Sequence, residues 1–174
     1  MERVVIREAK IDDAHSIAQV HVASWRSAYV DLMPSDFLAS LTTTLSAREA
    51  QWTRAIERKD ADILVAEVEG KVVGWISVGP CRDEDTSEAK AGEVMAIYLL
   101  SDDWGKGIGT ALWKAGMKRL HDQGYRNVTL WVLSANERAL RFYQGLGGKE
   151  DMNSRRTLVR GGVTLGEVRY VWVS

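Results

Sequence analysis

Apolar side chains recur at three- and four-residue steps through the first third of the chain, after a short apolar run over residues 3–9. That spacing places them on one face of a helix, because an α-helix turns once in about 3.6 residues. We predict a strand over residues 3–9, a helix capped by Asp12 and Asp13, a short helix opened by Pro34, and a third helix that Ser46 caps. The apolar face of the first helix comprises Ala14, Ile17, Ala18, His21, Trp25 and Ala28.

From residue 62 onward the pattern changes to β-rich runs separated by turn residues. Residues 62–70 and 71–79 meet at a Glu-Gly-Lys turn and predict a hairpin. The run EVMAIYLL, residues 93–100, is apolar almost throughout, which is typical of a strand buried on both faces. The remaining predicted elements are a helix over residues 108–120, a strand over residues 127–133, a short helix starting at Asn136, and a final hairpin over residues 157–173 that turns at Gly161 and Gly162.

The order of these elements predicts the architecture. Strand–helix–strand units in the middle of the chain require parallel neighbours, whereas the hairpins require antiparallel ones. We therefore expect a mixed α/β fold with a central sheet of about six to seven strands and helices on both faces. Nothing in the pattern resembles a repeat or a linker, so we expect one domain over residues 1–174.

Composition and charge narrow the possible partners. The 23 basic and 24 acidic residues give a formal net charge of −1, which provides no electrostatic reason to expect nucleic acid or an anionic membrane. The single cysteine, Cys81, suits a reducing compartment, and the first ten residues lack the apolar core of a signal peptide, so we expect a cytoplasmic protein. His15, His21 and His121 lack metal-ligand spacing, and we expect no metal.

The segment WGKGIGTALW, residues 104–113, places three glycines at alternate positions before a predicted helix. It is not a P-loop, because Leu100 stands where the first glycine of that motif belongs. It fits the dinucleotide fingerprint poorly, because Thr110 occupies the last glycine position. The same loop physics still favours a pyrophosphate, because the first turn of a helix offers free N–H groups. A tight strand-to-helix turn without a ligand is the alternative.

Two segments together resemble the GNAT family of N-acetyltransferases. Residues 96–113, AIYLLSDDWGKGIGTALW, are similar to the segment of that family that binds acetyl-CoA, and residues 136–147, NERALRFYQGLG, are similar to its second signature. The predicted element order matches the family from the first strand to the last hairpin. There are two departures: Trp104 stands where Arg or Gln is usual, and Gly148 where an aromatic residue is usual.

The resemblance implies an enzyme that transfers an acetyl group from acetyl-CoA to a primary amine, by direct attack in a ternary complex. A sensor on the same fold that binds acyl-CoA without turnover is the alternative, and a nucleotide-binding protein of another class is a third. The residues expected to bind the coenzyme, through backbone N–H groups or through the second signature, are Ile97, Tyr98, Leu99, Trp104, Gly105, Lys106, Gly107, Ile108, Gly109, Thr110, Asn136, Ala139, Phe142 and Tyr143.

The chemistry needs a neutral amine, a donor for the oxyanion and a proton for the departing thiolate. By the resemblance, the N–H of Ile97 is the oxyanion donor and Tyr143 is the acid; a phenol is protonated at neutral pH. Tyr143 could instead only anchor its helix through packing. Glu93, at the start of the central strand, stands where some family members place a general base, but a solvated strand-end carboxylate is the alternative.

The sequence indicates the binding site of the amine acceptor less specifically than that of the coenzyme. Trp25 and Tyr29, four residues apart on one helix face, either border the amine pocket together with Glu93 or belong to the core. The acidic run Asp83, Glu84, Asp85 and Glu88 could attract a cationic amine, although a solvated loop explains it as well. Polyamine, aminoglycoside-like drug, amino acid, protein N-terminus and lysine all remain open as acceptors. A homodimer that pairs through the C-terminal RYVWVS is a further expectation.

Overall fold

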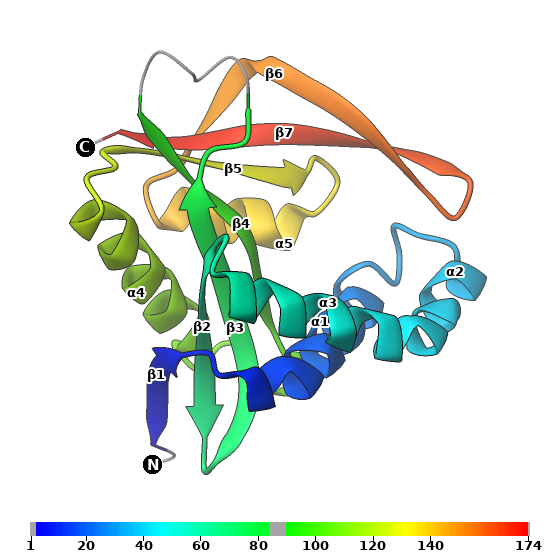
Figure 1. Cartoon of the computed structure of the whole chain (residues 1–174). Coiled ribbons are helices and arrows are strands. Elements are labelled where there is room, and N and C mark those ends of the chain that lie inside the picture. Colours follow the sequence, from blue (N-terminus) through cyan, green and yellow to red (C-terminus); the bar gives the residue numbers. More distant parts are fainter. Residues whose placement is uncertain (1–2, 84–89, 174) are drawn as a thin grey trace.

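The computed structural model describes residues 3–83 and 90–173 (Figure 1). Its α-helices are α1 (Ala14–Ala28), α2 (Ser35–Ser40), α3 (Leu45–Arg58), α4 (Ile108–Asp122) and α5 (Glu137–Gly145), with short 3-10 turns η1 (Ile11–Asp13), η2 (Leu41–Thr44) and η4 (Ser101–Asp103). Its strands are β1 (Val4–Glu8), β2 (Asp62–Val68), β3 (Lys71–Pro80), β4 (Ala91–Leu99), β5 (Asn127–Leu133), β6 (Lys149–Arg160) and β7 (Val163–Val173).

The seven strands form one sheet in the order β1-β2-β3-β4-β5-β7-β6. All neighbours are antiparallel except β4 and β5, which are parallel and joined through α4. The predicted mixed sheet with helices on both faces is thereby confirmed. Figure 1 shows β5 and β7 crossing β2, β3 and β4 at a large angle, so the sheet is strongly twisted at its centre.

The alternation of side chains along β2 shows how the sheet separates two apolar layers. Leu64 and Ala66 belong to the cluster that packs against α4, whereas Ile63 and Val65 belong to the cluster formed with α1 and α3. Successive residues of a strand point to opposite faces, so a run that is apolar at every position is buried from both sides. This part of the sheet is therefore the middle layer of the fold.

The parallel pair at the centre of the sheet is very short. Only Ala91, Gly92 and Glu93 of β4 are paired with β5, at Asn127 through Thr129. The register between β3 and β4 also shifts between Ser77 and Val78, which places a β-bulge near Met95. Beyond the bulge β4 remains paired with β3 and β5 remains paired with β7, so the two halves of the sheet separate in the shape of a V.

The strand β4 is accordingly less buried than its apolar sequence predicts. Its first four residues are buried, but residues 95–99 are only partly buried. The reason is that β5 no longer covers this half of the strand. The expectation of a strand buried on both faces is therefore wrong for the C-terminal half of β4.

The predicted helix caps hold only in part. Asp13 is the N-cap residue of α1 but makes no side-chain bond to that helix; its carboxylate accepts from the backbone N–H of Lys10 at 2.7 Å, in the capping box of the preceding turn η1, and from the Arg7 guanidinium at 2.8 Å. The helix α3 begins at Leu45, one residue before Ser46, and its N-cap Thr44 makes no side-chain cap. The final hairpin is longer than predicted, because β6 begins at Lys149 and crosses an irregularity between Asp151 and Arg156.

The structure explains the unexpected glycine at position 148. A Cβ atom built there would lie 2.5 Å from Cζ2 of Trp172 and 3.0 Å from the Tyr143 carbonyl oxygen. The Trp172 indole, from β7, packs on Trp113 with ring centroids 4.6 Å apart. A large aromatic side chain from β7 thus fills the space beside position 148. Glycine is required there by close approach, because interiors are packed to crystal-like density.

We expect Gly148→Ala to destabilise the protein by about 1–3 kcal/mol, the usual cost of overpacking. Urea unfolding measures this. Trp172→Phe removes the ring atoms that the new methyl group meets, so the double variant should lose less free energy of unfolding than the sum of the single variants. The control is Gly145→Ala, in α5, where a Cβ atom meets nothing within 4 Å. Strict additivity would contradict the packing argument.

None of the helices in the described ranges 3–83 and 90–173 is both long enough and apolar enough to span a membrane.

Candidate acetyl-CoA and amine site

A cavity of about 720 Å³ opens where β4 and β5 separate. Its walls come from four parts of the chain: the end of α1, the C-terminal half of β4 with the glycine loop, the end of β5 with α5, and the β6–β7 hairpin. The cavity brings together most residues that the sequence singles out. These are Trp25, Tyr29, Glu93, Ile97, Tyr98, Leu99, Trp104, Gly105, Gly107, Gly109, Thr110, Asn136, Ala139, Phe142 and Tyr143.

Two predicted coenzyme residues have side chains elsewhere. The Ile108 side chain is buried in the core beneath α4. The Lys106 side chain is partly exposed and forms a long ion pair with Asp103 at 3.5 Å. Only the backbone N–H groups of these two residues remain candidates for the coenzyme, as the sequence predicts.

Strand pairing decides which backbone groups of β4 face the cavity. The N–H of Leu100 donates to the carbonyl of Val73, and Tyr98 lies opposite Trp75 in the same register. In an antiparallel sheet hydrogen-bonded and non-hydrogen-bonded residue pairs alternate, so Tyr98, two residues from Leu100, belongs to a hydrogen-bonded pair. Its N–H and C=O groups therefore point to β3. Those of Ile97 and Leu99 point away from β3, into the opening. The expected backbone contacts therefore narrow to Ile97 and Leu99, and Tyr98 lines the cavity through its ring.

The glycine loop has the backbone geometry of an anion cradle. Gly105 and Gly107 have φ values of 75° and 82°, and a Cβ atom at either position would meet nothing within 4 Å. The first turn of α4 follows, and no side chain caps it. Its first N–H groups have no intrahelical acceptor, because a helix leaves its first four donors unpaired. The residues present thus fit a pyrophosphate, which needs open space and several convergent N–H groups.

The Trp104 indole makes no use of the loop amides. Its Nε1–H donates to the Leu99 carbonyl at 3.0 Å, and the Ser24 hydroxyl donates to the same oxygen at 3.2 Å. These two bonds occupy the carbonyl of Leu99, so the free backbone donors of this strand at the opening are the N–H groups of Ile97 and Leu99.

The second signature lies on α5, across the opening from β4. Asn136 caps this helix by accepting from the N–H of Ala139 at 3.2 Å. Tyr143, about two helical turns after Asn136, is largely buried among Trp113, Phe142, Tyr170 and Trp172. Burial raises the pKa of the Tyr143 phenol well above its usual value of 10. The phenol therefore stays protonated at neutral pH, and its hydroxyl bonds to no other residue in ranges 3–83 and 90–173.

Glu93 is buried and already bound, contrary to the solvated carboxylate that the sequence allows. The residue is 1% exposed, and the Arg82 guanidinium donates to its two carboxylate oxygens at 3.1 and 2.7 Å. The backbone N–H of Arg82 donates to the same carboxylate at 3.1 Å. This bidentate contact raises the pKa of Arg82. A carboxylate held by three donors has little lone-pair capacity left for accepting a proton from a water.

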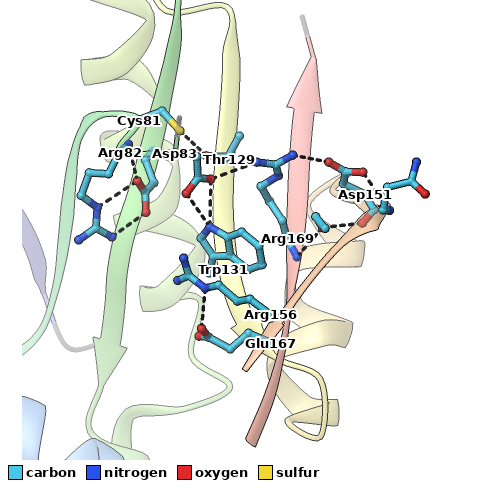
Figure 2. Close-up of polar contacts among 12 residues, drawn as sticks. Cys81, Arg82, Asp83, Thr129, Trp131, Asp151, Arg156, Glu167 and Arg169 are labelled. Carbon is cyan, nitrogen blue, oxygen red and sulfur yellow. Dashed lines mark hydrogen bonds and ion pairs between the residues drawn. The ribbon is translucent and has the colours of Figure 1, made fainter. Parts of the chain in front are cut away.

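A wall of alternating charges extends from this pair across β5 and β7 (Figure 2). The Trp131 Nε1–H donates to Asp83, which also pairs with Arg169 at 3.2 Å. The Arg156 guanidinium lies 3.9 Å from the Trp131 ring centroid and pairs with Glu167 at 2.9 Å. These contacts give Asp83 a structural role. The other members of the predicted acidic run, Glu84, Asp85 and Glu88, lie outside the described residues.

The end of the cavity next to α1 is aromatic. Trp25 and Tyr29 contact each other edge to face at 5.2 Å, and both line the cavity. Behind them His21 packs beside Trp25, as the sequence predicts, and stacks on Tyr98 at 5.2 Å. The rings of Trp25 and Tyr29 thus belong to an aromatic cluster and also border the cavity, and their contact with an amine stays a prediction.

Sequence reasoning missed the cations of the cavity. Arg138 and Arg141 stand three residues apart on α5, a spacing that places them on one helix face and could have drawn attention to them. For the cations of the sheet no sequence signal exists, because only the strand register brings them to the cavity. The missed residues that line it are Arg82, Arg138, Arg141, Arg156 and Arg160.

Comparison with known proteins agrees with this geometry. A family model described as Acetyltransferase (GNAT) family matches residues 22–147. The chain belongs to the GNAT family. The "Uncharacterized N-acetyltransferase YuaI" of Bacillus subtilis is 36% identical over 170 residues, which cover 97% of this chain and 92% of that protein. A "Mycothiol acetyltransferase" of Paenarthrobacter aurescens is 37% identical over 87 residues, 49% of this chain and 26% of that protein.

Solved structures confirm the GNAT fold. The PaiA N-acetyltransferase of Thermoplasma acidophilum in complex with coenzyme A superimposes with a TM-score of 0.75, at 18% identity and 99% coverage of both chains. A GNAT protein of Rhodopseudomonas palustris superimposes with a TM-score of 0.76, at 21% identity, over 100% of this chain and 98% of that one. At such identities the likeness concerns the fold. The predictions of the family and of its acetyltransferase class are confirmed.

We expect His21 to make the protein acid-sensitive. Burial, and then the Arg48 guanidinium 3.4 Å away, lower the pKa of His21 to about 4. The unfolded chain therefore binds this proton more tightly, so stability is full above about pH 6.5 and falls as the pH drops towards 4. We expect the free energy of unfolding, measured with urea, to fall between pH 7.5 and pH 5 by about 1–2 kcal/mol less in His21→Phe than in wild type.

His121→Gln is the matched control for His21→Phe, because its side chain is exposed on α4, and it should keep the wild-type pH dependence. An identical loss in His21→Phe and wild type would show that the His21 proton is not linked to folding.

Proposed function

We propose that this GNAT protein transfers the acetyl group of acetyl-CoA to the primary amine of a small molecule or peptide, by direct attack while both are bound. The observation that carries the proposal is one continuous cavity. It joins the glycine-loop amides, the unpaired edge of β4 and the Tyr143 side chain. In acetyl-CoA the pyrophosphate would contact the loop amides, the extended pantetheine arm would lie along the edge of β4, and the thioester would lie beside Tyr143.

The open edge of β4 suits the pantetheine arm. Ile97 and Leu99 present backbone groups at a sheet position that no strand fills, and buried backbone groups require partners. An extended amide-containing chain adds to such an edge as another strand would. Asn136, on the opposite side of the opening, supplies a side-chain amide toward the same arm.

The catalytic groups follow from the same placement. The nitrogen of a neutral amine attacks the thioester carbonyl, a C–N bond forms and the C–S bond breaks. The N–H of Ile97 stabilises the oxyanion, and Tyr143 gives its proton to the departing thiolate. The surplus proton on the nitrogen of the tetrahedral intermediate leaves to water, and water returns a proton to the Tyr143 phenolate. The Tyr143 phenol holds its proton at neutral pH and can therefore donate it when the thiolate develops.

Enzyme and sensor differ in turnover. A thiol-release assay over a panel of polyamines, aminoglycosides, amino acids and peptides, with acetyl-CoA as donor, should show coenzyme A release above background with at least one amine class. Calorimetric titration should show binding of acetyl-CoA and none of ATP or NAD. Binding without release over the whole panel would favour the sensor. Binding of ATP or NAD in place of acetyl-CoA would contradict both.

We expect Tyr143→Phe to lower kcat by about 100-fold or more, the usual contribution of a general acid, while the Kd for acetyl-CoA changes little. The ring contacts with Trp113 and Trp172 remain in this variant, so the fold should be preserved. Steady-state kinetics and calorimetry separate the two quantities. Equal losses in kcat and affinity would mean that the hydroxyl is a binding group.

For Glu93 we propose that it holds Arg82 against the cavity wall, in place of the general-base role that its strand position suggests. Glu93→Gln weakens the ion pair and should lower kcat/KM by a similar factor at every pH. Arg82→Gln, which removes the other partner, should cause a comparable loss. A base would give a different profile for Glu93→Gln, with a loss that grows toward low pH, where little free amine exists. That profile would overturn this assignment.

A further inference from the structure

Trp104 and Arg138 form a stacked pair at the mouth of the glycine loop. The Arg138 guanidinium carbon lies 3.3 Å from the centroid of the Trp104 ring. The ring itself is fixed, because its Nε1–H donates to the Leu99 carbonyl at 3.0 Å. A planar guanidinium on an indole face is held by cation–π attraction, which restricts an otherwise flexible side chain.

The pair lies beside the loop amides. Trp104, Arg138 and Gly107 line the same cavity. A Cβ atom at Gly109 would lie 3.5 Å from Cζ of Phe142, so α5 packs directly against the start of α4. Phe142 follows Arg138 by four residues, which places both side chains on one face of α5. The guanidinium and the free N–H groups of the loop therefore border one space.

Within the described part of the chain, the positive charge on this side of the cavity has no acidic partner. Neither Arg138 nor Arg141 pairs with an acidic side chain anywhere in ranges 3–83 and 90–173. Desolvation and the neighbouring Arg141 lower the pKa of Arg138, so an anion between the two would relieve their repulsion. Of the other cations of the cavity, Arg82 and Arg156 each have a carboxylate partner, whereas Arg160 donates to the Val159 carbonyl.

We propose that Arg138, held flat by Trp104, is the side-chain ligand for a phosphate group of coenzyme A, and that Trp104 is a positioning residue that does not itself touch the phosphate. The inference rests on the proposed use of acetyl-CoA. It explains how the chain can lack the usual Arg or Gln at position 104, because the cation comes from α5. The pyrophosphate and the 3′-phosphate share the chemistry that Arg138 recognises.

Calorimetric titration of wild type, Arg138→Gln and Arg54→Gln with four ligands tests this. The ligands are coenzyme A, 3′-dephospho-coenzyme A, phosphopantetheine and pantetheine. Arg54 is exposed on α3 and outside the cavity, so its variant controls for the loss of one charge. Arg138→Gln should weaken the binding of coenzyme A about tenfold, a typical value for a charged hydrogen bond. The same variant should bind pantetheine as wild type does, and Arg54→Gln should bind coenzyme A with wild-type affinity.

The shortened ligands identify the phosphate. A tenfold loss that persists with 3′-dephospho-coenzyme A assigns Arg138 to the pyrophosphate, and a loss that disappears with it assigns Arg138 to the 3′-phosphate. Coenzyme A affinity within twofold of wild type in Arg138→Gln would overturn the proposal, as would an equal loss with pantetheine. The proposed activity is judged separately, by acetyl transfer at saturating acetyl-CoA.

A double-mutant cycle tests the positioning role of Trp104. Trp104→Ala should weaken the binding of coenzyme A. Adding this change to Arg138→Gln should lower the affinity little further, because the two residues act as one unit. Trp104→Phe keeps a ring under the guanidinium and should retain most of the affinity, although it loses the bond to Leu99. Additive losses, or a Trp104→Phe variant as weak as Trp104→Ala, would contradict the positioning role.

Discussion

The site depends on the failure of β4 and β5 to stay paired. They share only the pairs from Ala91–Asn127 to Glu93–Thr129, and then the bulge near Met95 directs β4 along β3 while β7 holds all of β5. A sheet interior with unpaired backbone groups is costly unless a ligand or water satisfies them. The opening therefore both creates the cavity and gives it an unpaired strand edge.

Two departures from the family motifs have the same physical explanation. Gly148 lacks an aromatic side chain because Trp172 reaches the same space from β7. Trp104 lacks a hydrogen-bonding side chain suited to phosphate, and the Arg138 guanidinium stacks on its ring from α5. In the first case a side chain from another element fills the space, and in the second we propose that a side chain from another element supplies the phosphate contact. A motif compared letter by letter misses this exchange, which depends on tertiary packing.

Local patterns predicted the sheet, the helix order and the glycine-rich turn before α4, because these depend on period and on backbone freedom at Gly105 and Gly107. They could not predict the Arg82–Glu93 pair or the contact of Arg156 with Trp131, because those depend on strand register over long sequence separations. The same limit applies to Tyr98. Its position in the motif indicated a backbone contact, but pairing with Trp75 uses those groups and leaves only its ring at the cavity.

Amide hydrogen exchange at β4 tests the account most directly. Acetyl-CoA at saturation should slow exchange at Ile97 and Leu99, whereas adenosine 3′,5′-bisphosphate, which lacks the pantetheine arm, should not. The Tyr98 amide should be protected in the free protein already, because it bonds to β3. Unchanged exchange at Ile97 and Leu99 with saturating acetyl-CoA would contradict the claim that the open edge of β4 binds the pantetheine arm.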